Sequence, residues 1–205
     1  MTALDKILLL ATGLVAVYLL YRLWGRYAKG KALWDLYYMM AFLVLLISGL
    51  LLILLGYEIL ASPYVLTVAS LIPLGISMGI AEQYYPAWKK PFKWFALIGF
   101  LVIALTSLGG MQVPKKVAVP LFHGGAGLVI FLGPFFAGKA PRGFRWVGIG
   151  GLLIGLGGIA LAFLSAGTQL LFFSQTFVMQ ILAGLLLLMS LAFCWGFMKD
   201  MRGST

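Results

Sequence analysis

Charged residues are scarce in this chain, and acidic residues are the scarcest of them. Only 10% of the 205 residues are charged, five of them acidic, whereas 63% are hydrophobic. An ordinary soluble domain carries about 25% charged residues, and no soluble fold hides so large an apolar fraction. The composition therefore predicts an integral membrane protein.

Histidine and cysteine each occur once, which limits the chemistry of a single chain. Cys194 alone forms no disulfide or cysteine-based metal site, and His123 alone excludes haem ligation by two histidines. No basic residue falls in the middle of an apolar run, and all five acids are expected at or near a membrane interface. Proton pumps, voltage sensors and most ion-coupled transporters need intramembrane charge, so these classes are disfavoured. We also expect no enzyme, because the chain lacks a nucleophile–base pair or a metal cluster.

Long apolar runs fill most of the chain and are separated by short charged or turn-forming segments. A spanning helix needs roughly 20 mostly apolar residues. Seven runs approach or exceed this length, near 7–24, 33–56, 63–85, 94–112, 117–137, 146–165 and 169–198. We therefore predict one domain, residues 1–205, formed by an all-α bundle of about seven transmembrane helices.

The basic residues are distributed unevenly between the two sides of this predicted bundle. Of the 15 Lys and Arg residues, all but Lys6, Lys115 and Lys116 follow spans one, three, five or seven. Basic residues gather on the cytoplasmic side, so we expect the N-terminus outside and the C-terminus in the cytoplasm. The net charge of +10 then indicates membrane topology and no nucleic-acid partner. The expected location is the cytoplasmic (inner) cell membrane, in a multi-pass arrangement.

Small residues recur along one face of the sixth span. They are spaced three or four positions apart, at Gly148, Gly151, Gly155, Gly158 and Ala162. Such faces let helices approach closely in lipid, where no hydrophobic force drives their association. We interpret this face as a helix-packing surface within the chain, with a partner subunit or a flat ligand as alternatives.

His123 lies in the fifth span, about two turns from the predicted outer boundary. Gly124, Gly125 and Gly127 leave space beside its imidazole. Our first interpretation is a buried histidine hydrogen-bonded to a neighbouring helix, since a polar group at that depth needs a partner. The alternatives are a ligand contact and a single axial ligand to a tetrapyrrole, and otherwise we expect no cofactor and no metal.

Two short stripes of neutral polar residues occur in spans three and seven. The first contains Thr67, Ser70 and Ser77, and the second contains Gln169, Thr176 and Gln180. Such groups most often form hydrogen bonds between helices. The alternative is a narrow polar path for a solute, with His123 beside it.

Two acids on the basic side receive ordinary structural interpretations. Asp35 follows Lys31 by four residues at the start of span two, which suits a helix start and a local ion pair. Glu82 lies beside Tyr84, Tyr85 and Lys89 and is interpreted in the same way.

These observations favour an interaction or structural subunit of a membrane complex without catalytic activity. Its partners would be the lipid bilayer and other membrane subunits, or further copies of the same chain. A channel or facilitator for a small neutral or lipophilic solute is the alternative hypothesis. A binder of a tetrapyrrole held by one histidine is a lesser one.

Overall fold

The computed structural model describes residues 1–165 and 174–203, and these form helices joined by short connections. The α-helices are α1 (Ala3–Gly30), α2 (Leu33–Leu55), α3 (Pro63–Ala69), α4 (Leu71–Tyr84), α5 (Lys89–Leu108), α6 (Gln112–Phe136), α7 (Arg145–Ser165) and α8 (Gln175–Gly203). Short 3₁₀ turns stand in three of the connections, as η1 (Tyr57–Ala61), η2 (Pro86–Trp88) and η3 (Arg142–Phe144). The described chain is therefore an all-α bundle, as the sequence predicted.

Local sequence explains where several helices begin, end or break. Thr2 and Asp5 form a reciprocal capping box at the start of α1, and Lys31 ends that helix in the left-handed region at φ 51°. The third predicted span is interrupted at Ser70 and becomes α3 and α4. Pro73 has no N–H to donate to the Ala69 carbonyl, which accounts for an interruption at this point.

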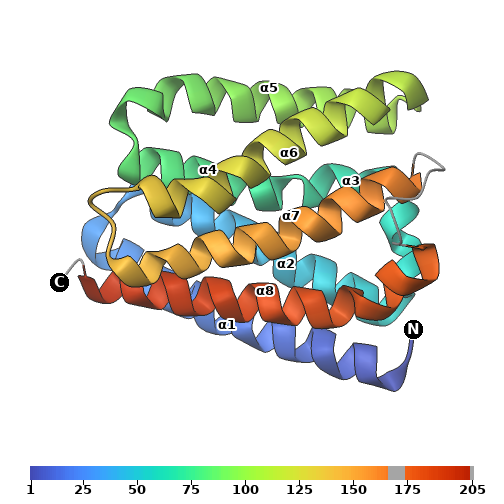
Figure 1. The fold of residues 1–205 in the computed structure, drawn as a ribbon, viewed down its shortest axis with the longest axis horizontal. Helices are drawn as coiled ribbons and strands as arrows, with labels where there is room; N and C mark the ends of the chain where they lie inside the picture. The colour runs from blue at the N-terminus through green and yellow to red at the C-terminus, as the bar shows by residue number, and fades with distance from the viewer. Residues whose placement is uncertain (166–173, 204–205) are drawn as a thin grey trace.

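The helices lie roughly along one axis of the bundle and alternate in direction (Figure 1). The start of α1 and the end of α8 lie at opposite ends of the long axis, as an odd number of crossings requires. The α1–α2, α4–α5 and α6–α7 connections gather at the end where α8 finishes. The hairpin of α5 and α6 lies on one side of the bundle, with α5 outermost (Figure 1).

Aromatic side chains from several helices form the core nearest the end of α8. The ring centroid of Phe197 lies 4.6 Å from that of Tyr38 and 5.5 Å from that of Phe42. Phe144 of η3 and Phe193 of α8 are buried in the same cluster. This packing holds α2 and α8 together next to the polar cluster described in the following subsection.

The outer surface of the bundle is widely apolar. Leu14 of α1 and Leu105 of α5 are 65% and 67% exposed, and many other large hydrophobic side chains on these helices are also exposed. Six helical segments in the described part of the chain are long and apolar enough to cross a membrane, with α3 and α4 counted as one. These properties suit a multi-pass membrane protein, because exposed apolar patches of this extent are rare on soluble monomers.

Two of the predicted spans end several residues before the corresponding helices of the structure do. α1 continues six residues past position 24 to Gly30, and α8 continues five residues past position 198 to Gly203. Both extensions carry charged residues, Arg26 on α1 and Asp200 on α8, that the predicted boundaries had placed outside the helices. The beginning of the seventh predicted span, residues 169–173, lies outside the described part of the chain.

Candidate functional site

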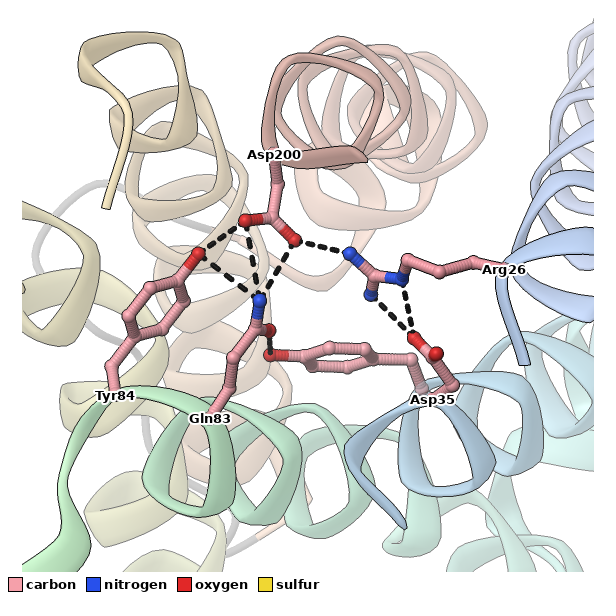
Figure 2. Close-up of polar contacts among 6 residues, drawn as sticks. Arg26, Asp35, Gln83, Tyr84 and Asp200 are labelled. Carbon is pink, nitrogen blue, oxygen red and sulfur yellow. Dashed lines mark hydrogen bonds and ion pairs between the residues drawn. The ribbon is translucent and has the colours of Figure 1, made fainter. Parts of the chain in front are cut away.

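Arg26, near the end of α1, binds two buried carboxylates at once (Figure 2). Its Nε donates to Asp35 Oδ1 of α2 at 2.6 Å, and its Nη1 donates to Asp200 Oδ2 of α8 at 2.6 Å. The Asp35 and Asp200 side chains are 0% and 2% exposed, and that of Arg26 is 16% exposed. One guanidinium therefore joins the first, second and last helices.

Three neutral side chains extend this contact into a network around Asp200 (Figure 2). The Tyr84 hydroxyl donates to Asp200 Oδ1, and the Gln83 amide nitrogen lies 3.3 and 3.1 Å from the two carboxylate oxygens. The Gln83 amide oxygen accepts a hydrogen bond from the Tyr38 hydroxyl at 3.0 Å. We call Arg26, Asp35, Tyr38, Gln83, Tyr84 and Asp200 the arginine–carboxylate cluster.

Each charged member of the arginine–carboxylate cluster continues the buried face of its helix. The fully buried neighbours on these faces are Leu19 and Leu23 before Arg26, Tyr38 and Phe42 after Asp35, and Phe193 and Phe197 before Asp200. On α4, Gly79 admits the Tyr38 ring, because a Cβ there would stand only 2.6 Å from Tyr38 Cδ1. Helical periodicity therefore brings the charges together.

The electrostatics of the cluster favour a fixed arrangement of four helix ends. One guanidinium faces two carboxylates, and the donors of Gln83 and Tyr84 help to solvate the second negative charge. Buried ions are tolerated only when they are paired and hydrogen-bonded, so loss of one partner is costly. Within residues 1–165 and 174–203, no group of three or more His, Cys, Asp or Glu residues is placed to hold a metal ion. The contacts that the cluster makes between α1, α2, α4 and α8 are ion pairs and hydrogen bonds.

The predicted ion pair between Asp35 and Lys31 is wrong. Lys31 ends α1, and its Nζ lies 5.1 Å from the centre of the Tyr27 ring, whereas Asp35 is bound by Arg26. Asp35 and Asp200 lie in the first turn of α2 and the last turn of α8, and both are buried within the bundle. The expectation that all acids lie at or near a membrane interface stays a prediction. The ion-pair part of the Glu82 interpretation is confirmed, since its carboxylate oxygens lie 3.2 Å from Lys89 and 2.9 Å from Lys93. The helix-start part is wrong, because Glu82 lies in the last turn of α4.

The polar residues of the third predicted span bond to their own helices. The Thr67 hydroxyl donates to Pro63 O at 2.8 Å, that of Ser70 to Thr67 O at 2.7 Å, and that of Ser77 to Pro73 O at 2.6 Å. All three side chains are buried.

Two hollows lie on the surface of the bundle, one between α7 and α8 (lined by Trp146 and Leu188 among others) and one between α1 and α8 (lined by Tyr18 and Met198 among others). The structure does not bring the two polar stripes together in either hollow. Gln180 is exposed on α8, and neither it nor the hydroxyls of α3 and α4 line these hollows. Gln169 and the side chain of Thr176 lie outside the described part of the chain. The solute-path hypothesis remains a prediction.

The His123 imidazole of α6 points toward α7. Its Nε2 lies 3.2 Å from where a Cβ on Gly158 would stand. No hydrogen bond joins the imidazole to another residue in the described part of the chain. Gly124 and Gly127 have open space around them, whereas Gly125 is covered by the Phe95 ring of α5.

The small-residue face of α7 is covered at Gly148, Gly151 and Gly158, whereas Gly155 between them meets no described atom. A Cβ on Gly148 would stand 2.6 Å from Phe131 O, and one on Gly151 would stand 2.7 Å from Ile130 Cγ2. A Cβ on Gly155 would meet no described atom within 4 Å, and Ala162 has no described side chain. Gly150, which is off the predicted face, packs against Phe193 of α8. Glycines of α7 therefore serve two helix contacts.

Comparison with protein-family models, with curated proteins and with solved structures found no match to this chain. The fold and the site alone define its class. It is an all-α bundle with six described segments long and apolar enough to cross a membrane, joined at one end by a buried arginine–carboxylate cluster.

Proposed function

We propose that this chain is a non-catalytic, multi-pass subunit of a membrane-protein complex in the cytoplasmic membrane. Its N-terminus lies outside and its C-terminus lies in the cytoplasm, because twelve of the 15 basic residues belong to the side where α8 ends. In this orientation the arginine–carboxylate cluster fixes the cytoplasmic ends of α1, α2, α4 and α8.

Uncovered glycines on two neighbouring helices carry the proposal. A Cβ built on Gly124 or Gly127 of α6, or on Gly155 of α7, meets no described atom within 4 Å. We call these three positions the glycine notch. One turn away from Gly155, Gly151 is closely covered by α6. Small residues allow close helix approach in lipid, so the glycine notch suits a helix from a partner subunit.

His123 lies beside the glycine notch and supplies a polar group for the same interface. Its neighbour across the helix contact is Gly158 of α7, which offers no side chain to bond. Polar side chains within membranes are expensive and are kept where a partner exists. A hydrogen-bonding side chain or carbonyl on the partner helix would satisfy the imidazole.

Site-specific photo-crosslinking in native membranes tests this proposal. A photoreactive amino acid at Leu128, on α6 beside Gly124 and Gly127, should give an adduct with a second membrane protein. The matched control is the same group at Leu14 of α1, since the two leucines are 59% and 65% exposed. An adduct from position 128 alone supports the proposal. Equal adducts from both positions, or a monomer without adducts, would contradict it.

A further inference from the structure

The connection between α6 and α7 packs closely against the rest of the bundle. Phe144 of η3 is fully buried in the aromatic core. A Cβ on Gly143 would stand 2.5 Å from Lys199 Cγ, and one on Gly203 would stand 3.2 Å from Pro141 Cβ, so this connection also lies directly on the last turns of α8. The turn therefore holds a defined position at the end of the bundle where α8 finishes (Figure 1).

The 3₁₀ geometry of η3 places its side chains on three different sides of the turn. The Arg145 N–H donates to the Arg142 carbonyl, which is the hydrogen bond between residues i and i+3 that defines a 3₁₀ turn. Side chains three residues apart eclipse one another in this geometry, so Arg142 and Arg145 share one side. Gly143 lies against α8, and Phe144 lies in the core. The side with the two arginines therefore faces outward, and both residues are exposed.

Neither guanidinium on this side has a partner within residues 1–165 and 174–203. No described side chain forms an ion pair or a hydrogen bond with Arg142 or Arg145. The three acids at this end of the bundle are bound by cations of other elements. They are Asp35, Glu82 and Asp200. Two like charges thus stand on one side of an anchored turn, and no described acid balances them.

Two neighbouring guanidinium groups suit the chemistry of a phosphate group. Each presents N–H donors in a planar fork that can bind two oxygens of one phosphate, and each stays charged at any physiological pH. A phosphate bound by Arg142 and Arg145 would also offset the repulsion between them. Lys139, exposed in the same connection, adds a third positive charge. Because the turn is already packed in place, little ordering is needed on binding.

We infer that the outward side of η3 binds a phosphate group through Arg142 and Arg145. The source that the surroundings favour is the headgroup of an anionic phospholipid, because Trp146 follows directly and is 46% exposed. Indole rings prefer the membrane–water interface, and basic residues just cytoplasmic of it attract anionic headgroups. The lipid source rests on the proposed membrane orientation, whereas the phosphate site does not. A soluble phosphate compound is the other source of the same chemistry.

Native mass spectrometry of the full chain in detergent, with phosphatidylglycerol and phosphatidylcholine of equal chain length in competition, tests the lipid source. Wild type should retain phosphatidylglycerol in preference to phosphatidylcholine, whose choline balances the phosphate charge. The double variant Arg142→Gln/Arg145→Gln should weaken that preference roughly 10- to 30-fold. The matched control, Lys29→Gln/Lys90→Gln, removes two exposed charges from the same end of the bundle and should keep the wild-type preference.

Inorganic phosphate is the second probe, and it distinguishes the two sources. If wild type shows no lipid preference but melts at a higher temperature in phosphate than in chloride of equal ionic strength, and the double variant does not, the source is a soluble phosphate compound. Equal retention of both lipids without stabilisation by phosphate, or an equal loss in the control variant, would overturn the inference. Both measurements use the purified chain, so failure of the crosslinking at Leu128 would refute the proposed function and leave this test unchanged.

Discussion

Arg26 and Asp200 stand 174 residues apart in the chain and meet in a 2.6 Å ion pair inside the bundle. This pair joins the first helix to the last. Asp35 of α2 shares the same guanidinium, and separation of α8 from α1 would leave the Asp200 carboxylate without this cation. The contact is therefore expected to contribute strongly to the stability of the end of the bundle where α8 finishes.

Replacement of Arg26 tests that expectation. Arg26→Met leaves Asp35 and Asp200 buried without a cation, which should cost about 3–5 kcal/mol of unfolding free energy. Arg26→Lys should recover only part of the loss, because an ammonium lacks the planar fork that reaches both carboxylates. Lys29→Met, at an exposed position on the same helix, is the control. Thermal unfolding in one detergent gives the comparison, and equal melting of all variants would refute the role of Arg26.

Replacement of each tyrosine of the arginine–carboxylate cluster by phenylalanine should lower the unfolding free energy by a different amount. Tyr84→Phe removes one donor from Asp200, which keeps Arg26 and Gln83, so the cost should be about 0.5–1.5 kcal/mol. Tyr38→Phe removes the only described hydrogen bond to the Gln83 amide oxygen, so its cost should reach about 1–3 kcal/mol. Urea or thermal unfolding of both variants checks the order. A larger loss for Tyr84→Phe would contradict it.

Alanine substitutions at two glycines of α7 should have opposite effects on stability. Gly151→Ala puts a Cβ 2.8 Å from the backbone carbon of Ile130, so overpacking should cost about 1–3 kcal/mol. Gly155→Ala meets open space in the described structure and replaces glycine in a helix, so the isolated chain should gain up to about 1 kcal/mol. The same Gly155→Ala should reduce recovery of a partner from native membranes. Equal destabilisation at the two positions would remove the distinction.

One visible absorption spectrum distinguishes the two interpretations of His123. As a residue at a helix interface, His123→Gln should keep most of the stability and His123→Leu should reduce partner recovery. A wild-type preparation from native membranes should then show no visible absorption band. A visible band that shifts in His123→Gln would instead favour the tetrapyrrole hypothesis. An unchanged band would assign the pigment to another protein in the preparation.

The helical bundle was predictable because apolar runs of about 20 residues have few alternatives. Pro73 also gave a signal for the interruption of the third span, because proline lacks the N–H that forms the helical hydrogen bond. The arginine–carboxylate cluster was missed because the spans were ended at positions 24 and 198, so Arg26 and Asp200 were assigned to interfaces. A signal was present, since each lies three residues beyond a buried apolar residue, Leu23 and Phe197 respectively.

The partners of these charges could not be read from sequence. Lys31 stands four residues before Asp35, but the left-handed backbone at Lys31 breaks the helical spacing that would pair them. Arg26 reaches Asp35 across the turn between α1 and α2, and it reaches Asp200 only through the packing of α1 on α8. Likewise, one small-residue pattern on α7 predicted one contact face, whereas in the structure residues of α6 cover Gly151 and Gly158 and no described atom covers Gly155.

The central claim is a membrane-spanning bundle with its basic end in the cytoplasm, and cysteine labelling in intact cells tests it most directly. Cys194→Ala supplies a background without cysteine, to which Lys116→Cys or Lys90→Cys is added, both at exposed positions. A membrane-impermeant maleimide should label position 116 in intact cells and position 90 only after permeabilisation. Labelling of position 90 in intact cells, or release of the protein from membranes by alkaline carbonate, would contradict the account.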